Sequence, residues 1–430
     1  MTTPNDKSGS SSSATANPLP VDTARALIRA AVTPIEATER VALRAALNRV
    51  LARDIVSPID VPAHDNAAMD GYAFDGAALS AGAPLTLVVA GEARAGHPFD
   101  RSCGSRECVR IMTGAPMPPG CDTVVPQEFV TRTGSNVVFD PQTLAPGANR
   151  RRAGEDLARG RAALKAGRIV RPADLGLLAS LGVAEVAVRR RVRVAFFSTG
   201  DELRSVGEPL ETGCVYDSNR YTLHAMLARL NIDALDLGVV RDEPDAIEAA
   251  LHAAAKSADV VLTSGGVSVG DADFTARMTA TLGDVAFWQL AMRPGRPFAF
   301  GRLWPDGRGA GGSSALFFGL PGNPVAVMVS FYQLVRDALV AMSGAIAPGP
   351  LQFAAASGVP IKKRPGRTEF LRGIATRDAA GCWSVTPTHS QGSGVLSSMS
   401  EANCFIVLTH AQGDVSAGES VDIMPFEGLI

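Results

Sequence analysis

Four turns in the middle of the chain combine glycines, hydroxyls and carboxylates. Each follows an apolar segment, and they are Ser198 to Glu202, Arg241-Asp242, Thr263 to Asp273, and Gly319 to Pro324. Glycine lets main-chain N–H groups approach a phosphate, and a following helix N-terminus adds favourable partial charge. Carboxylates would repel a bare phosphate, so this combination suits a site in which a divalent cation such as Mg²⁺ neutralises the charge.

Each of these turns has a simpler explanation when it is taken alone. A glycine-rich turn is often a plain connection between a strand and a helix. Asp242 or Asp271 can simply cap a helix. The chain contains neither G-x-G-x-x-G after a strand nor G-K-[ST], so a dinucleotide fingerprint and a P-loop are absent from the sequence. The coincidence of the four turns is what favours a ligand site.

Other polar strings leave two interpretations open. Arg293-Pro294-Gly295-Arg296-Pro297 offers two guanidinium forks for an oxyanion, or it is a solvated basic loop. The strings His64 to Ala73 and Arg110 to Pro116 are typical of turn-rich surface loops. The arginines of Arg150 to Asp156 hold either an anion or a neighbouring acidic surface.

The elements that must position the four turns alternate between strand and helix. Strands are predicted at 192–197, 234–240, 259–263, 284–290, 298–301 and 315–318, and helices at 220–230, 244–255, 271–281 and 324–342. This alternation predicts a mostly parallel sheet covered on both faces. The carboxyl ends of parallel strands share one edge, where ligands bind in such sheets. The four turns would therefore meet.

The rest of the chain has a different texture. Residues 19–54 are predicted to be helical, with a second helix near 43–51, and another helix at 173–181 packs back on them. Residues 58–162 and 346–430 carry short apolar runs between Gly and Pro clusters, which is typical of β domains. Residues 1–18 form a Ser-rich tail that we expect to be disordered.

Composition excludes several classes of function. The chain has 430 residues and a net charge of −2, so it has no global basic field for nucleic acid or an anionic membrane. Its six cysteines form no C-x-x-C pair and are expected to be reduced. No signal-peptide pattern and no apolar run of about 18 residues are seen, which predicts a cytoplasmic protein without a membrane span.

Six of the strings, in order, resemble the molybdopterin molybdenumtransferase (MoeA, gephyrin E-domain) family. They are Asp65 to Ala73, Ile111 to Pro116, Arg152 to Asp156, Phe197 to Leu203, Thr263 to Gly270, and Leu320 to Pro324. The resemblance covers residues 20 to 428. It implies a multidomain α/β plus β protein: domain I at 19–57 and 163–192, an inserted β domain II at 58–162, an α/β domain III at 193–345, and a β domain IV at 346–430. It also implies a homodimer.

The resemblance further implies the reaction and its residues. Adenylylated molybdopterin and molybdate would give molybdenum cofactor and AMP, with Mg²⁺ as the metal and the molybdopterin adenylyltransferase as a possible partner. The implied catalytic positions are Asp70, Thr113, Asp156, Glu202, Asp242 and Asp273, of which Glu202, Asp242 and Asp273 would hold Mg²⁺. The implied substrate contacts are Ser264, Gly265, Gly266, Ser268, Arg293, Arg296, Pro321, Asn323 and Pro324. Gln289 departs from the family pattern, in which many relatives have a lysine.

Two alternatives remain at this point. One is the adenylyl transfer step, which uses a similar α/β domain and would consume ATP. The strings around Asp70 and Thr113 argue against a stand-alone enzyme of that kind. The other is a gephyrin-like scaffold that binds partner peptides. The carboxylates Glu202, Asp242 and Asp273 favour an enzyme over a pure scaffold.

Overall fold

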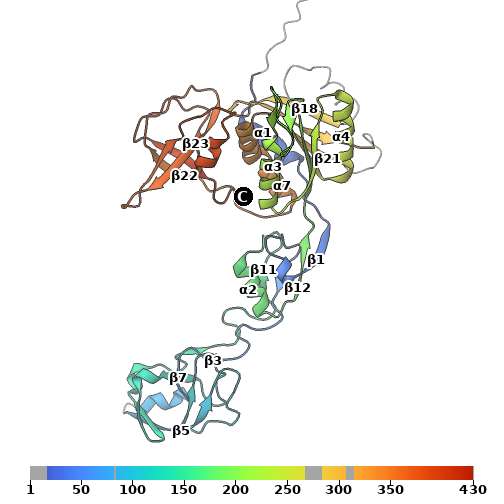
Figure 1. Cartoon of the computed structure of the whole chain (residues 1–430). Helices are drawn as coiled ribbons and strands as arrows, with labels where there is room; N and C mark the ends of the chain where they lie inside the picture. The colour runs from blue at the N-terminus through green and yellow to red at the C-terminus, as the bar shows by residue number, and fades with distance from the viewer. Residues whose placement is uncertain (1–16, 82–83, 267–282, 307–313, 430) are drawn as a thin grey trace, which may run out of the picture. The chain divides into compact units, whose positions relative to one another are not determined.

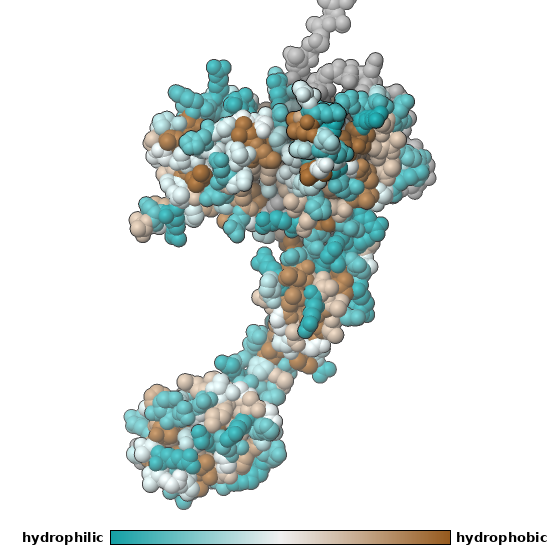
Figure 2. Space-filling model, viewed as in Figure 1, coloured by the Kyte–Doolittle hydropathy of each residue, from teal (hydrophilic) through white to brown (hydrophobic). Residues whose placement is uncertain are grey.

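The computed structural model describes residues 17–81, 84–266, 283–306 and 314–429. The chain divides into two compact units, one formed by residues up to 38 together with 189–430, and one formed by residues 39–188. Hydrophilic residues cover much of the visible face of each unit, with hydrophobic ones in small patches between them (Figure 2).

The first unit is built on a six-stranded sheet with the order β16-β13-β17-β21-β20-β18. These strands are β13 (Arg193–Thr199), β16 (Asp233–Val240), β17 (Val260–Ser264), β18 (Gly283–Gln289), β20 (Pro297–Leu303) and β21 (Ala315–Leu320). β16, β13, β17 and β21 run parallel, whereas β20 pairs antiparallel with β21 on one side and with β18 on the other. In register, Ser198 lies beside Ser264, and Ser264 beside Leu320. The four parallel strands therefore end at one edge, and the predicted strands and their common edge are confirmed.

Helices cover both faces of this sheet (Figure 1). One face packs against α1 (Val21–Ala31), α3 (Ser218–Arg229) and the helix that begins at Pro324, in a core that includes Phe196, Phe318 and Leu227. The other face packs against α4 (Pro244–Ser257), through Phe197 and Leu251. The odd and even residues of β13 thus enter different cores, as expected for a strand buried on both sides. The predicted helix at 271–281 lies outside the described residues.

The helix from Pro324 to Met342 is interrupted by a π-helical turn. It consists of α6 (Pro324–Ser330), the turn Phe331–Val335, and α7 (Arg336–Met342). Its 19 residues are long and apolar enough to cross a membrane, contrary to the prediction that no such run exists. The prediction missed it because apolar residues continue through the polar positions Ser330 and Gln333. In the structure 78% of the apolar window is buried inside the protein, so the helix is part of a core.

The C-terminal residues of the first unit form a closed β-barrel. The strand order is β19-β23-β24-β22-β26-β25, and an additional pairing of β23 with β25 closes the sheet. The strands are β19 (Met292–Arg293), β22 (Phe353–Ser357), β23 (Thr368–Arg377), β24 (Trp383–Pro387), β25 (Cys404–Leu408) and β26 (Ser420–Pro425), with the short α8 (Ser397–Glu401). Ile406, Ile423 and Val385 are buried in its interior. The predicted C-terminal β region is confirmed.

The second unit contains a six-stranded sheet with the order β7-β4-β6-β5-β9-β8. The strands are β4 (Gly71–Phe74), β5 (Leu85–Ala93), β6 (Glu107–Ile111), β7 (Thr123–Pro126), β8 (Thr131–Thr133) and β9 (Asn136–Phe139). Two short pairs, β3 (Asn66–Ala67) with β10 (Arg150–Arg151) and β2 (Ile55–Val56) with β11 (Ala162–Leu164), connect this sheet to α2 (Pro172–Ser180). The predicted β texture of residues 58–162 is confirmed.

The predicted helix over 19–54 is wrong beyond residue 31. Residues Thr38–Ala42 form β1, which pairs with β12 (Glu185–Arg189), and only Leu43–Ala45 forms a single 3₁₀ turn. Asn48 has a φ of 61°, a left-handed conformation that ends any helix over 43–51. α2 does pack on this segment, since Leu178 shares a core with Ala46 and Leu51.

The two compact units divide the predicted domain I, residues 19–57 with 163–192, at residue 38. Val21, Ala24 and Ile28 of α1 are buried in the core of the α/β sheet, so residues up to 38 belong to the first unit. Their helical spacing predicted an apolar stripe, but the stripe alone does not say which core it enters. The finer division into four domains stays a prediction.

Candidate functional site

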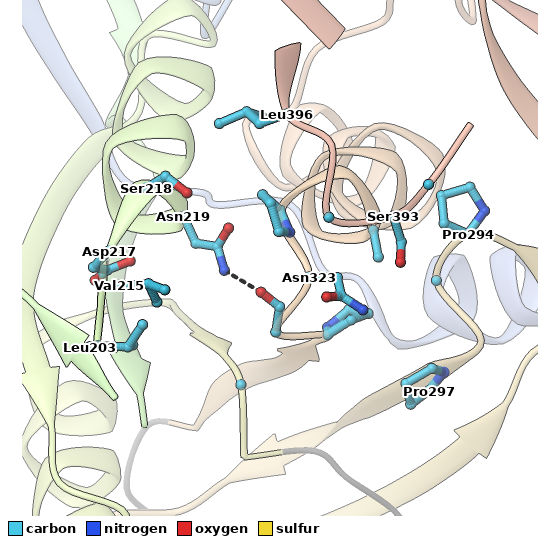
Figure 3. A pocket seen from close by; sticks show the side chains of 18 of the residues that line it. Leu203, Val215, Asp217, Ser218, Asn219, Pro294, Pro297, Asn323, Ser393 and Leu396 are labelled. Atoms are coloured by element: carbon cyan, nitrogen blue, oxygen red, sulfur yellow. Dashed lines mark hydrogen bonds between the residues drawn. The ribbon is translucent and has the colours of Figure 1, made fainter. Parts of the chain in front are cut away.

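A pocket of about 1030 Å³ lies at the carboxyl edge of the parallel strands. Its walls come from the turn after β13, the start of α3, the turn after β17, the loop before β20, the turn after β21, and a segment that follows β24. The lining residues include Glu202, Gly265, Gly266, Arg293, Arg296, Pro321 and Pro324. Figure 3 labels further lining residues, among them Leu203, Val215, Asp217, Asn219, Asn323 and Ser393. Three of the four predicted turns, those after β13, β17 and β21, therefore line one pocket, whereas Arg241 and Asp242 are not among its lining residues.

The glycine turn after β17 approaches β13 closely. Gly265 and Gly266 have φ values of 87° and 66°, which favour glycine. A Cβ atom at Gly265 would lie 2.5 Å from the carbonyl oxygen of Thr199, and so no other residue fits there without a shift of the main chain. This close approach leaves main-chain groups, rather than side chains, on the pocket wall, as a phosphate site requires.

The two arginines of the 293–297 loop contribute positive charge to the same pocket. β19 (Met292–Arg293) pairs with β23 of the barrel, which sets Arg293 beside Glu369. Glu369 is 2% exposed, and its carboxylate lies 3.8 Å from Nη1 of Arg293 and accepts a 2.8 Å hydrogen bond from Nε of Arg367. Arg293 and Arg296 are both exposed on the pocket wall, and Arg293 has in addition a buried carboxylate that orients it and partly neutralises it.

The barrel supplies the remaining wall through residues 391–396. Arg372 is 1% exposed, and its guanidinium donates to the carbonyl oxygens of Ser390 and Gly392 and to the hydroxyl of Ser398. Burial, with a smaller effect from the nearby Arg293, lowers the pKa of Arg372 to about 10, so it stays protonated at neutral pH. The carbonyl oxygen of Ser393 accepts a 3.0 Å bond from the main chain of Val325, which ties this wall to α6.

The predicted carboxylates lie on neighbouring turns, as far as the structure describes them. Glu202 lines the pocket, and its carboxylate occupies the space above Gly200, where a Cβ atom would lie 2.6 Å from it. The main-chain N–H of Asp242 donates a 3.3 Å bond to Asp201, which joins the turns after β16 and β13. Asp273 and Ser268 lie outside the described residues. In the part of the chain that is described, no three His, Cys, Asp or Glu residues lie close enough together to hold a metal ion.

The remaining predicted positions lie in the second unit, where Asp70 and Thr113 contact each other. Asp70 Oδ1 accepts bonds of 2.7 Å from both the main-chain N–H and the hydroxyl of Thr113. These bonds, the main-chain one first, lower the pKa of Asp70. Asp156 is exposed, on the turn after β10.

Hydrogen bonds join the three predicted segments of this unit, which are Asp65 to Ala73, Ile111 to Pro116 and Arg152 to Asp156. The main chains of Ala67 and Gly114 are bonded at 2.8 Å, and Ala153 N–H donates to Asp65 at 2.8 Å. Segments more than 80 residues apart in sequence thus meet in one cluster.

Several residues of the site were not predicted from sequence. Asp217 and Asn219 line the pocket, and Glu369 and Arg372 support it from behind. Asp217 carries a usable signal, because an Asp directly after a short strand and before a helix is typical of an N-cap. Its carboxylate does accept from the main-chain N–H of Arg220 at 3.2 Å. Ser264, which was predicted to contact the substrate, is only 1% exposed, and its hydroxyl accepts a hydrogen bond from Asn219. Its side chain therefore supports the turn after β17 from inside the protein.

Comparisons with known proteins cover nearly the whole chain. Family models match residues 19–182 (MoeA N-terminal region, domain I and II), 195–341 (probable molybdopterin binding domain) and 354–426 (MoeA C-terminal region, domain IV). The molybdopterin molybdenumtransferase of Haemophilus influenzae is 44% identical over 91% of this chain and 95% of its own length. That of a Nostoc species is 34% identical over 90% of this chain and 88% of its own.

A solved structure agrees with these matches. The molybdopterin biosynthesis MoeA protein of Pyrococcus horikoshii superposes with a TM-score of 0.82 at 29% identity, and the alignment covers 95% of this chain and 100% of that one.

Proposed function

The chain belongs to the molybdopterin molybdenumtransferase family, and we propose that it inserts molybdenum from molybdate into adenylylated molybdopterin with release of AMP. The observation that carries this proposal is the single pocket whose walls combine Gly265-Gly266, Arg293 and Arg296, and Glu202. A substrate with a phosphoanhydride and a second oxyanion needs main-chain donors, fixed cations and a carboxylate that can hold a metal. The pocket, with a volume of about 1030 Å³, has room for a substrate that contains two ring systems.

The cationic wall would bind the oxyanions. Arg296 is exposed to the pocket and offers a planar fork for molybdate, while Glu369 limits how far the side chain of Arg293 can turn. The turn of Gly265-Gly266 and its continuation at Ser268 would bind the phosphates through main-chain N–H groups. Pro321, Asn323 and Pro324 form the adjacent wall, and the two prolines keep its shape rigid.

Mg²⁺ is the metal that the carboxylates fit. Glu202 and Asp242 lie on adjacent turns joined by the Asp242–Asp201 hydrogen bond, and hard carboxylate oxygens are the ligands that Mg²⁺ prefers. We propose these two with Asp273 as its ligands. When bound, the metal would neutralise charge on the phosphoanhydride, so that the bond to AMP can break. The chain's own residues orient the substrate and hold molybdate beside it.

We propose that the second unit contributes to catalysis when two copies of the chain assemble. We propose a homodimer in which Asp70, Thr113 and Asp156 act at the pocket of the other copy, and a four-domain division of each chain. Asp70 would act as an anion, because its bonds to Thr113 favour the charged form. The enzyme would work in the cytoplasm and receive adenylylated molybdopterin from the molybdopterin adenylyltransferase.

One assay tests the proposal. The purified chain with adenylylated molybdopterin and Mg²⁺ should release AMP in a molybdate-dependent way, measured by chromatography of the nucleotide. No release above that of the protein-free mixture would reject it. Consumption of ATP with molybdopterin would instead favour the adenylyltransferase, and binding of peptides without AMP release would favour the scaffold.

A further inference from the structure

The N-terminal end of α3 makes hydrogen bonds with β13, with β17 and with the turn that follows β21. Ser198, near the end of β13, donates its hydroxyl to Asp217 at 3.1 Å. Asn219 Nδ2 donates to the hydroxyl of Ser264, which ends β17, at 2.7 Å. The same nitrogen donates to the carbonyl oxygen of Gly322, in the turn after β21, also at 2.7 Å (Figure 3). One amide therefore joins the two neighbouring turns, after β17 and after β21, that line the pocket.

The orientation of this amide follows from its partners. A main-chain carbonyl only accepts hydrogen bonds, so Nδ2 and not Oδ1 must face Gly322. Asn219 is 8% exposed, and its Oδ1 has no hydrogen-bond partner among the described residues. The whole side chain is thus committed to Ser264 and Gly322 through one nitrogen.

The two turns joined by Asn219 have few side-chain contacts of their own at Gly265 and Gly322. Gly265 and Gly322 have no side chain, and the main-chain N–H of Gly265 reaches Leu320 at 3.2 Å. Ser264 Oγ lies 3.4 Å from the carbonyl of Pro321, a long contact. A displacement of a few tenths of an ångström would change how their N–H groups meet a bound phosphate, and such donors depend strongly on geometry.

We propose that Asn219 is a positioning residue, which sets the separation of the Gly265-Gly266 turn from the Pro321–Pro324 turn and thereby the binding of the phosphate-bearing substrate. This inference rests on the proposed function. Asn219 does not touch the reacting atoms in it. Its loss should therefore weaken substrate binding more than it slows the chemical step.

The test compares three variants of the full-length chain by steady-state AMP release. Asn219→Ala removes the donor, and Asn219→Asp places a carboxylate oxygen against the carbonyl of Gly322. Asn403→Ala is the matched control, because the Asn403 side chain also makes two hydrogen bonds, accepting from the N–H of Ala375 at 2.7 Å and donating to its carbonyl oxygen at 2.9 Å, on the barrel and outside the pocket lining. Melting temperatures of all three separate global stability from positioning.

We expect Asn219→Ala to raise KM for adenylylated molybdopterin about tenfold, in line with the loss of a buried hydrogen bond, with kcat changed by less than about threefold. Asn219→Asp should raise KM further, and Asn403→Ala should leave both parameters near wild type. Wild-type KM for Asn219→Ala would overturn the inference, as would an equal effect of Asn403→Ala at equal melting temperature. An inactive wild-type chain would instead reject the proposed function.

Discussion

Thr113 donates two hydrogen bonds to one oxygen of Asp70, from its main-chain nitrogen and from its hydroxyl, each at 2.7 Å. Asp70 and Thr113 are 43 residues apart and meet because β4 pairs with β6. The arrangement favours an ionised Asp70, whose pKa is lowered in the folded chain. A depressed carboxyl pKa stabilises the fold above the unfolded pKa, and this contribution is lost as pH falls through the folded pKa.

Thr113→Val should raise the pKa of Asp70 part of the way towards its ordinary value. The hydroxyl donor is lost, but the main-chain donor, which is the larger cause, remains. Thr113→Ser keeps both donors and should leave the pKa unchanged. Carbon NMR titration of labelled aspartates, assigned with Asp70→Asn, measures this directly. An unshifted Asp70 signal in Thr113→Val would show that the hydroxyl contributes nothing.

Asp242→Asn should lower AMP release by at least about tenfold and raise the Mg²⁺ concentration for half-maximal activity, as expected for the loss of a metal ligand. The substitution leaves the main-chain bond of residue 242 to Asp201 in place, and thermal unfolding of the variant measures whether its stability is retained. Asp233→Asn, at the start of β16 and so at the opposite end of the strand from Asp242, is a charge-matched control. An unchanged Mg²⁺ dependence in Asp242→Asn would remove this residue from the proposed ligand set.

The parallel sheet and its functional edge could be predicted because they depend on local patterns. Apolar runs such as Val192 to Phe197 identify strands buried on both faces, and parallel pairing then places every strand end at one edge. The prediction of a helix over 19–54 was wrong beyond residue 31 because the structure there depends on a distant strand. Its apolar residues suit either a helix or a short strand, and the pairing of β1 with β12, some 140 residues later, decides between them.

Support for the pocket could not be predicted, since it depends on contacts between distant segments. Arg293 lies beside Glu369 only because β19 joins the barrel sheet. Arg372 reaches the 390–392 carbonyls through the barrel's own strand order, and no spacing in the sequence signals this. Asn219 likewise bonds Gly322, 103 residues away, through the packing of α3 on the sheet.

Arg296→Ala should raise KM for molybdate by about tenfold or more, because a hydrogen bond from a charged donor contributes roughly 1.5–3 kcal/mol. Arg296→Lys keeps the positive charge and should retain most activity. Arg377→Ala, on the exposed end of β23, is the control for a loss of net charge. Molybdate titrations at fixed adenylylated molybdopterin measure the effect. Equal KM values in Arg296→Ala and Arg377→Ala would mean that Arg296 does not bind the oxyanion.

Phe318→Ala should destabilise the first unit by about 3–5 kcal/mol, since it leaves a cavity in a packed core. Phe318 is fully buried on β21, with ring centroids 5.1 Å from Phe300 and 6.3 Å from Phe298. Phe129→Ala removes a ring that is 61% exposed in the second unit and should change stability by less than about 0.5 kcal/mol. Thermal and urea unfolding of both variants compare the two positions. If both lose stability equally, the core described around β21 is not the one that holds the sheet together. If Phe318→Ala alone unfolds early, the strand end that presents Pro321 and Asn323 to the pocket depends on this core.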